Sequence, residues 1–131
     1  MVEDDDSIRE TLALALEMAG HDVQAVTGVD GALASIERNW PDVLLLDLTL
    51  GGSTTGDSFY CDLIARFGVA PPTIFLSGVS DGERRVSGRA WSGVRFLPKP
   101  SSIEALEQAV NAALEWGRNH PERSRLGPRV A

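Results

Sequence analysis

The stretch Asp42–Asp47 (DVLLLD) decides the fold class, because it is a short, continuous apolar run that ends at a carboxylate. A run without polar alternation is typical of a parallel strand that is covered on both faces. Thr73–Leu76 (TIFL) is a second run of this kind, and it is followed by Ser77. Two such strands predict a sheet that is buried between two layers of helices.

Helical patterns alternate with these strands along the chain. Five helices are predicted from apolar residues at helical spacing and from the residues that cap or break helices. The first runs from Asp6 or Ser7 to Gly20, the second from Asp30 to before Pro41, and the third follows the loop Gly51–Gly56. The fourth covers residues 81–91, and the fifth runs from Ser101 or Ser102 to Gly117. Weaker strand patterns lie at Val23–Val26 and Val94–Leu97, and a very short one precedes Glu3. The alternation predicts an α/β fold with a doubly wound, five-stranded parallel sheet.

Composition sets limits on the class of protein. The 131 residues predict one domain over residues 1–117 and a polar, basic tail over residues 118–131. The net charge is −7, and the tail carries four arginines against Glu122, so the body of the chain is strongly acidic. We therefore expect no nucleic-acid binding by this domain. A single cysteine, Cys61, indicates a reducing, cytoplasmic setting, and no apolar run is long enough for a membrane span.

Reactive side chains follow the expected strands at their carboxyl ends. These residues are Glu3 and Asp4, then Asp47, Ser77 and the only lysine, Lys99. Open parallel sheets place their sites beyond these strand ends, so we expect the five side chains to converge. Clustered carboxylates suit Mg²⁺. A carboxylate can also attack phosphorus, while an ammonium and a hydroxyl group bind the phosphoryl oxygens.

With these residues in order, the chain resembles a response-regulator receiver domain of bacterial two-component signalling, from about Val2 to Trp116. The resemblance implies a flavodoxin-like sheet of order 2-1-3-4-5. It implies that Asp47 is the phosphoacceptor, that Ser77 and Lys99 complete the catalytic set, and that Phe96 is a switch residue. By the same analogy, Mg²⁺ would be held by Glu3, Asp4, Asp47 and the carbonyl of Thr49.

The resemblance also implies a signalling mechanism. A sensor histidine kinase or a phosphotransfer protein would supply the phosphoryl group in a phosphorelay. The surface formed by residues 81–114 would then change and signal a downstream protein or form a homodimer. The domain would catalyse only its own phosphorylation and dephosphorylation, and so would not be an enzyme acting on other substrates.

Three departures from the family pattern accompany the match. The first strand is truncated, because only Met1 and Val2 precede Glu3; Gly51 stands where a proline is common; and Phe96 replaces a common tyrosine. Either a stand-alone receiver or a fragment of a longer regulator or hybrid kinase fits this sequence.

Two alternative functions stay open. The first is a degenerate receiver that works as an interaction module without phosphorylation. The second is a flavodoxin-type FMN-binding protein that uses Ser53–Ser58. An aspartate-dependent phosphatase is disfavoured, because Thr49 stands where such enzymes have a second aspartate.

Overall fold

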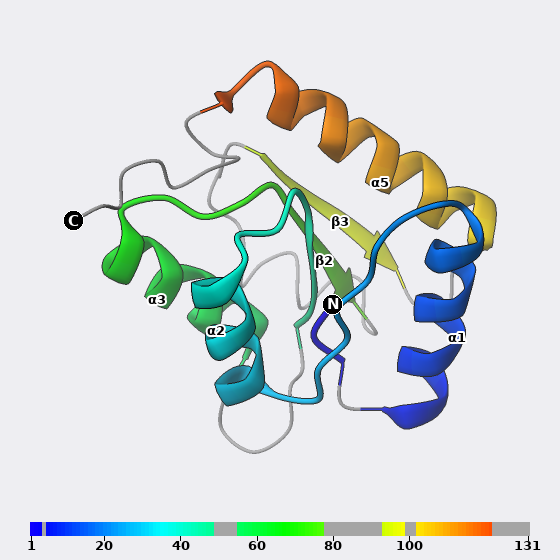
Figure 1. Cartoon of the computed structure of the whole chain (residues 1–131), viewed down its shortest axis with the longest axis horizontal. Helices are drawn as coiled ribbons and strands as arrows, with labels where there is room; N and C mark the ends of the chain where they lie inside the picture. The colour runs from blue at the N-terminus through cyan, green and yellow to red at the C-terminus, as the bar shows by residue number, and fades with distance from the viewer. Residues whose placement is uncertain (4, 49–54, 78–92, 99–101, 122–131) are drawn as a thin grey trace.

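Three parallel strands form the regular part of the sheet in the computed structural model (Figure 1), which describes residues 1–3, 5–48, 55–77, 93–98 and 102–121. The strands are β1 (Leu44–Asp47), β2 (Thr73–Ser77) and β3 (Val94–Pro98), and their order is β1-β2-β3. The helices are α1 (Asp6–Met18), α2 (Val29–Arg38), α3 (Gly56–Phe67) and α5 (Ile103–Arg118). The sheet is parallel throughout, as the two apolar runs predicted.

Val2 extends this sheet on the other side of β1. It forms parallel bridges with Leu46 and with Val26, so it lies between these two segments. The lateral order therefore follows the expected 2-1-3-4-5 arrangement, with a very short first strand in the middle. The second strand expected at Val23–Val26 is wrong as a regular element, because the structure has only a single bridge at Val26.

Helices cover both faces of the sheet. On one face, α2 and α3 pack on a cluster that includes Ile36, Leu46, Leu63 and Phe75. On the other face, α1 and α5 pack on a cluster whose buried residues are Leu16, Leu45, Ile74, Leu76, Leu106, Val110 and Ala113. Consecutive residues of β1 alternate between the two clusters, which explains why the run from Leu44 to Leu46 has no polar position.

Capping residues define the helix ends, and the structure corrects two of the expected ends. Asp5, rather than Asp6 or Ser7, caps α1, since its Oδ1 accepts a hydrogen bond from the Ile8 amide at 3.0 Å. Gly20 follows α1 with a φ of 98°, as expected for a residue just past a helix end. Gly117 does not end α5, which continues to Arg118 and packs Gly117 against Pro72. The expected N-cap Ser102 is confirmed, since its Oγ accepts from Ala105 N at 3.0 Å.

Several expectations concern residues beyond the described ranges. The helix expected over residues 81–91 and most of the tail expected over residues 118–131 lie outside them. Within the described ranges, no helix is both long enough and apolar enough to cross a lipid bilayer.

Candidate functional site

Two acidic residues lie side by side at the carboxyl edge of the sheet. Asp47 is the last residue of β1 and is only 3% exposed, while Glu3 is fully buried. Asp47 N donates a hydrogen bond to Val2 O at 3.1 Å, and the Val2–Leu46 bridge sets Glu3 level with Asp47. Residues that are level in a parallel pair present their side chains to the same face. The fold therefore brings together two of the carboxylates that the sequence placed in one site.

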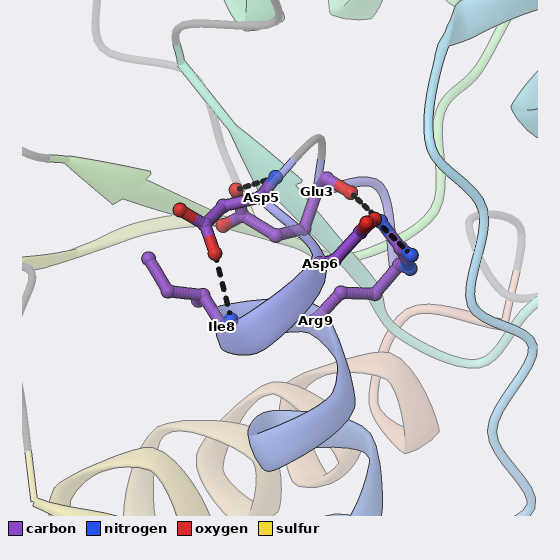
Figure 2. A network of polar contacts seen from close by, with 5 residues as sticks. All are labelled: Glu3, Asp5, Asp6, Ile8 and Arg9. Atoms are coloured by element: carbon purple, nitrogen blue, oxygen red, sulfur yellow. Dashed lines mark hydrogen bonds and ion pairs between the residues drawn. The ribbon is translucent and has the colours of Figure 1, made fainter.

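A polar network holds the turn between Glu3 and α1 (Figure 2). Glu3 Oε2 accepts a hydrogen bond from Asp5 N at 3.2 Å. The Arg9 side chain reaches back from the first turn of α1, where one nitrogen donates to the Glu3 carbonyl at 3.1 Å and another pairs with Asp6 Oδ1 at 2.6 Å. The Arg9 side chain is only 16% exposed, so its bond to the Glu3 backbone is shielded from water. Arg9 thus positions the backbone of one buried acid.

A glycine supports the other acid. Gly56, the first residue of α3, donates a backbone hydrogen bond to Leu48 O at 2.9 Å. A Cβ at position 56 would overlap the carbonyl oxygen of Asp47 and lie 3.0 Å from Leu48 Cα. Any larger residue would force the Asp47–Leu48 peptide or the helix to move. The start of α3 and the end of β1 can therefore approach this closely only with glycine at position 56.

Sequence reasoning missed the roles of Arg9 and Gly56. Gly56 was interpreted as the end of a Gly/Ser/Thr loop, although Thr55 before it is a typical N-cap and its Oγ1 accepts from Ser58 N at 3.4 Å. Arg9 follows Asp6 by three residues on a helix, a spacing that predicts the ion pair but not the bond to Glu3. Both roles depend on contacts between separate segments.

The other expected site residues follow the adjacent strands. Ser77 ends β2 and pairs with Pro98, the last residue of β3, so both strands end at the same edge as Asp47. Lys99 follows Pro98 in the chain but lies outside the described residues, as do Asp4 and Thr49. The structure thus places Glu3, Asp47 and the backbone of Ser77 at one edge and does not test the other three.

Phe96 is packed among aromatic residues. Its ring stacks on Phe75 of the neighbouring strand, with centroids 5.4 Å apart and an interplanar angle of 23°. Phe75 also meets Tyr60 of α3 edge to face at 5.8 Å. Phe96 is partly buried, and it sits two residues before the end of β3. The Phe96 ring thus contacts the core through Phe75, and Phe96 lies three residues before Lys99 in the sequence.

The acids at this edge fit a hard divalent cation. Carboxylate oxygens are the ligands that Mg²⁺ prefers, and two buried carboxylates are better accommodated with a cation between them. Within the described ranges, however, no group of three or more acidic, histidine or cysteine side chains gathers into a metal site. Glu3 and Asp47 are the described residues that could contribute to such a site.

Comparisons with known proteins identify the class. The family model of the response regulator receiver domain matches residues 1–111, which is most of the chain. The chain therefore belongs to the response regulator receiver domains, the phosphorylatable signalling domains of two-component systems. The fold agrees with this assignment, since it is α/β with a parallel sheet and is flavodoxin-like.

Particular relatives are bacterial regulators. The chain is 30% identical over 115 residues to the nitrogen assimilation regulatory protein NtrX of Azorhizobium caulinodans, covering 88% of this chain and 25% of that protein. It is 32% identical over 138 residues to the transcriptional regulatory protein FixJ of the same organism, covering 100% of this chain and 63% of that protein.

A solved structure of a receiver domain is also similar to this chain. The crystal structure of the receiver domain of NtrX from Brucella abortus is similar, with a TM-score of 0.76 and 28% identity, covering 87% of this chain and 95% of that one. This receiver is close in length to the chain, whereas NtrX and FixJ of Azorhizobium extend well beyond it. The shared unit is therefore the receiver domain, and the chain spans less than two thirds of the length of either Azorhizobium regulator.

Proposed function

We propose that this receiver accepts a phosphoryl group on Asp47 from a sensor histidine kinase or a phosphotransfer protein. The observation that carries the proposal is the bridge between Val2 and Leu46, which sets buried Glu3 beside buried Asp47 at the carboxyl edge of the sheet. Membership of the receiver family supports the same function. Phosphorylation-independent binding and flavin binding gain no support from any described contact.

The chemistry proposed for Asp47 is a substitution at phosphorus. One Asp47 carboxylate oxygen attacks the phosphorus of a phosphohistidine, the P–N bond breaks, and the imidazole leaves with its electron pair and takes up a proton. The product is an acyl phosphate on Asp47. When bound by Glu3, Asp4, Asp47 and the Thr49 carbonyl, Mg²⁺ would neutralise charge on the transferring group. Arg9 and Gly56 keep the two acid-bearing segments in register.

The response that we propose involves the neighbouring strand ends. Lys99 and Ser77 bind the phosphoryl oxygens, and the equilibrium between two packings of Phe96 then shifts. The changed surface is that of residues 81–114, which would contact a downstream protein or a second copy of the chain. We propose that the domain works in the cytoplasm and acts chemically only on itself, without binding nucleic acid.

Phosphorylation by a small donor tests the proposal. The protein is incubated with acetyl phosphate, with Mg²⁺ or with excess EDTA, and its intact mass is measured. We expect one added phosphoryl group in the wild type with Mg²⁺, and none with EDTA or in Asp47→Asn. The matched control is Asp62→Asn, because Asp62 is an exposed acid on α3. Equal labelling of wild type and Asp47→Asn would refute the assignment, and a folded but unlabelled wild type would favour the interaction module.

A further inference from the structure

Three aromatic rings connect the expected switch residue to α3. Phe96 of β3 and Phe75 of β2 are partners in the parallel register, and their rings stack with centroids 5.4 Å apart. The Phe75 ring meets Tyr60 of α3 edge to face, with centroids 5.8 Å apart and an interplanar angle of 63°. Both separations lie in the range in which aromatic side chains attract one another. We call Phe96, Phe75 and Tyr60 the ring series.

The ring series is enclosed at one end and partly open at the other. Phe75 and Tyr60 are 0% and 1% exposed, whereas Phe96 is only partly buried against their cluster. Phe96 therefore has room to change its packing, while the other two rings are surrounded by core residues. Because protein interiors are close-packed, a new position of the Phe96 ring changes the contacts of Phe75, and the neighbours of Phe75 take up that change. Tyr60 is the aromatic neighbour that belongs to a helix.

The same helix contacts the end of the strand that carries Asp47. Gly56, the first residue of α3, donates a hydrogen bond to Leu48 O at 2.9 Å, and it leaves no room for a Cβ beside the Asp47 carbonyl. Tyr60 follows Gly56 by four residues, which is about one helical turn. The first turns of α3 thus contact both the strand of the candidate phosphoacceptor and, through Phe75, the expected switch residue.

The far end of α3 has other partners. Phe67, its last residue, meets the ring of Trp40 edge to face, with centroids 5.5 Å apart and an interplanar angle of 78°. Arg66 Nη1 lies 4.0 Å from Glu37 Oε2 of α2. The two ends of α3 are therefore held by different parts of the molecule. A change in the ring series acts on the first turns of the helix, while Phe67 stays packed on Trp40.

We propose that Tyr60 is a positioning residue of the switch, which couples the packing of Phe96 to α3 through Phe75. The inference rests on the proposed phosphorylation of Asp47. When the equilibrium between the two packings of Phe96 shifts, the stack on Phe75 changes, and Tyr60 moves the first turns of α3 with it. Helix α3 is then a second responding element, separate from the surface of residues 81–114.

Cys61 provides a reporter for this response. It is the only cysteine of the chain, it directly follows Tyr60, and it is exposed. A trifluoromethyl group attached to its sulfur gives one fluorine NMR resonance, whose chemical shift depends on the local surroundings. The control position is Ala34, which is exposed on the neighbouring helix α2. Ala34→Cys combined with Cys61→Ser carries the same label there.

Phosphorylation of the labelled proteins tests the coupling. Each protein is incubated with Mg²⁺ and acetyl phosphate, and intact mass and the fluorine spectrum are recorded on the same sample. When the mass shows one added phosphoryl group, we expect the Cys61 resonance to shift by more than its linewidth and the control resonance to shift less. Phosphorylation without a shift at Cys61, or with equal shifts at both positions, would overturn the coupling alone. Absence of phosphorylation would refute the proposed function and this inference with it.

Variants of the rings test the route. In Phe75→Leu and Tyr60→Leu, which each remove one ring, the phosphorylation-induced shift at Cys61 should be lost although intact mass still shows the phosphoryl group. Tyr60→Phe keeps the ring and should keep the shift. Phe67→Leu is the matched control, because it removes an aromatic contact at the far end of α3. A full shift in folded Phe75→Leu or Tyr60→Leu, or its loss in Tyr60→Phe or Phe67→Leu, would overturn the proposal.

Discussion

The carboxyl end and the amino end of the central strand differ in how closely the surrounding residues pack against them. At the carboxyl end, Glu3 and Asp47 are buried, and Arg9 and Gly56 hold their backbones with short contacts from two helices. At the amino end, the strand begins with a buried amino group at a cavity of about 310 Å³, which is lined both by apolar residues and by His21, Asp22 and Asp42. The site edge of this receiver is thus closely packed around polar groups, whereas the opposite edge contains unfilled space.

The largest expected effect is in the core of β1. Leu46→Ala should lower the free energy of unfolding by about 3–5 kcal/mol, because the side chain is fully buried and its removal leaves a closed cavity. Leu44→Ala should cost less, roughly 2–3 kcal/mol, because Leu44 already lines the existing cavity at the amino edge of the sheet. Urea unfolding of both variants measures the difference. Equal losses would show that the existing cavity does not lower the free-energy cost of removing the Leu44 side chain.

Gly56→Ala should destabilise the protein by about 1–3 kcal/mol, because the added methyl group would collide with the Asp47–Leu48 backbone. It should also slow labelling by acetyl phosphate under conditions in which the variant is fully folded. Gly28→Ala is the control, since a Cβ there would meet no atom within 4 Å and its φ of −156° is extended. Labelling of folded Gly56→Ala at the wild-type rate would contradict a positioning role for Gly56.

Arg9→Gln should lower the free energy of unfolding by roughly 1–2 kcal/mol, through loss of the bonds to the Glu3 carbonyl and to Asp6. If the acidic edge holds Mg²⁺, the variant should also need more Mg²⁺ for half-maximal labelling. Arg38→Gln serves as the control, because Arg38 is exposed on α2. A Mg²⁺ requirement that rises equally in both variants would reflect net charge alone.

A pH dependence of stability is expected at the other edge. Because burial lowers the pKa of the Met1 amino group to about 6, the unfolded chain binds the proton more readily than the folded one between pH 6 and pH 8. Stability should therefore rise by about 2 kcal/mol as pH increases through this window. His21, Asp22 and Asp42 also line the cavity, so the contribution of the amino group is taken as the difference from an N-acetylated protein. An identical pH profile after acetylation would contradict the assignment.

Local patterns were enough to predict most of the elements. The runs Leu44–Leu46 and Ile74–Leu76 are apolar at every position, which is typical of a strand that is covered on both faces. The positions of Asp47 and Ser77 at strand ends followed directly, as did the cap at Ser102. Alternation alone was insufficient at Val23–Val26, where the length of a strand depends on the partner that it pairs with.

By itself, the sequence determined the fold class, the parallel sheet and the order of reactive residues at the strand ends, because hydrophobic periodicity and chain reversal are local properties. Only the tertiary structure decided that Arg9 donates a hydrogen bond to the backbone of Glu3 and that position 56 must be glycine. These features arise where segments that are distant in the sequence approach within a few ångströms. Local sequence patterns do not predict such distances.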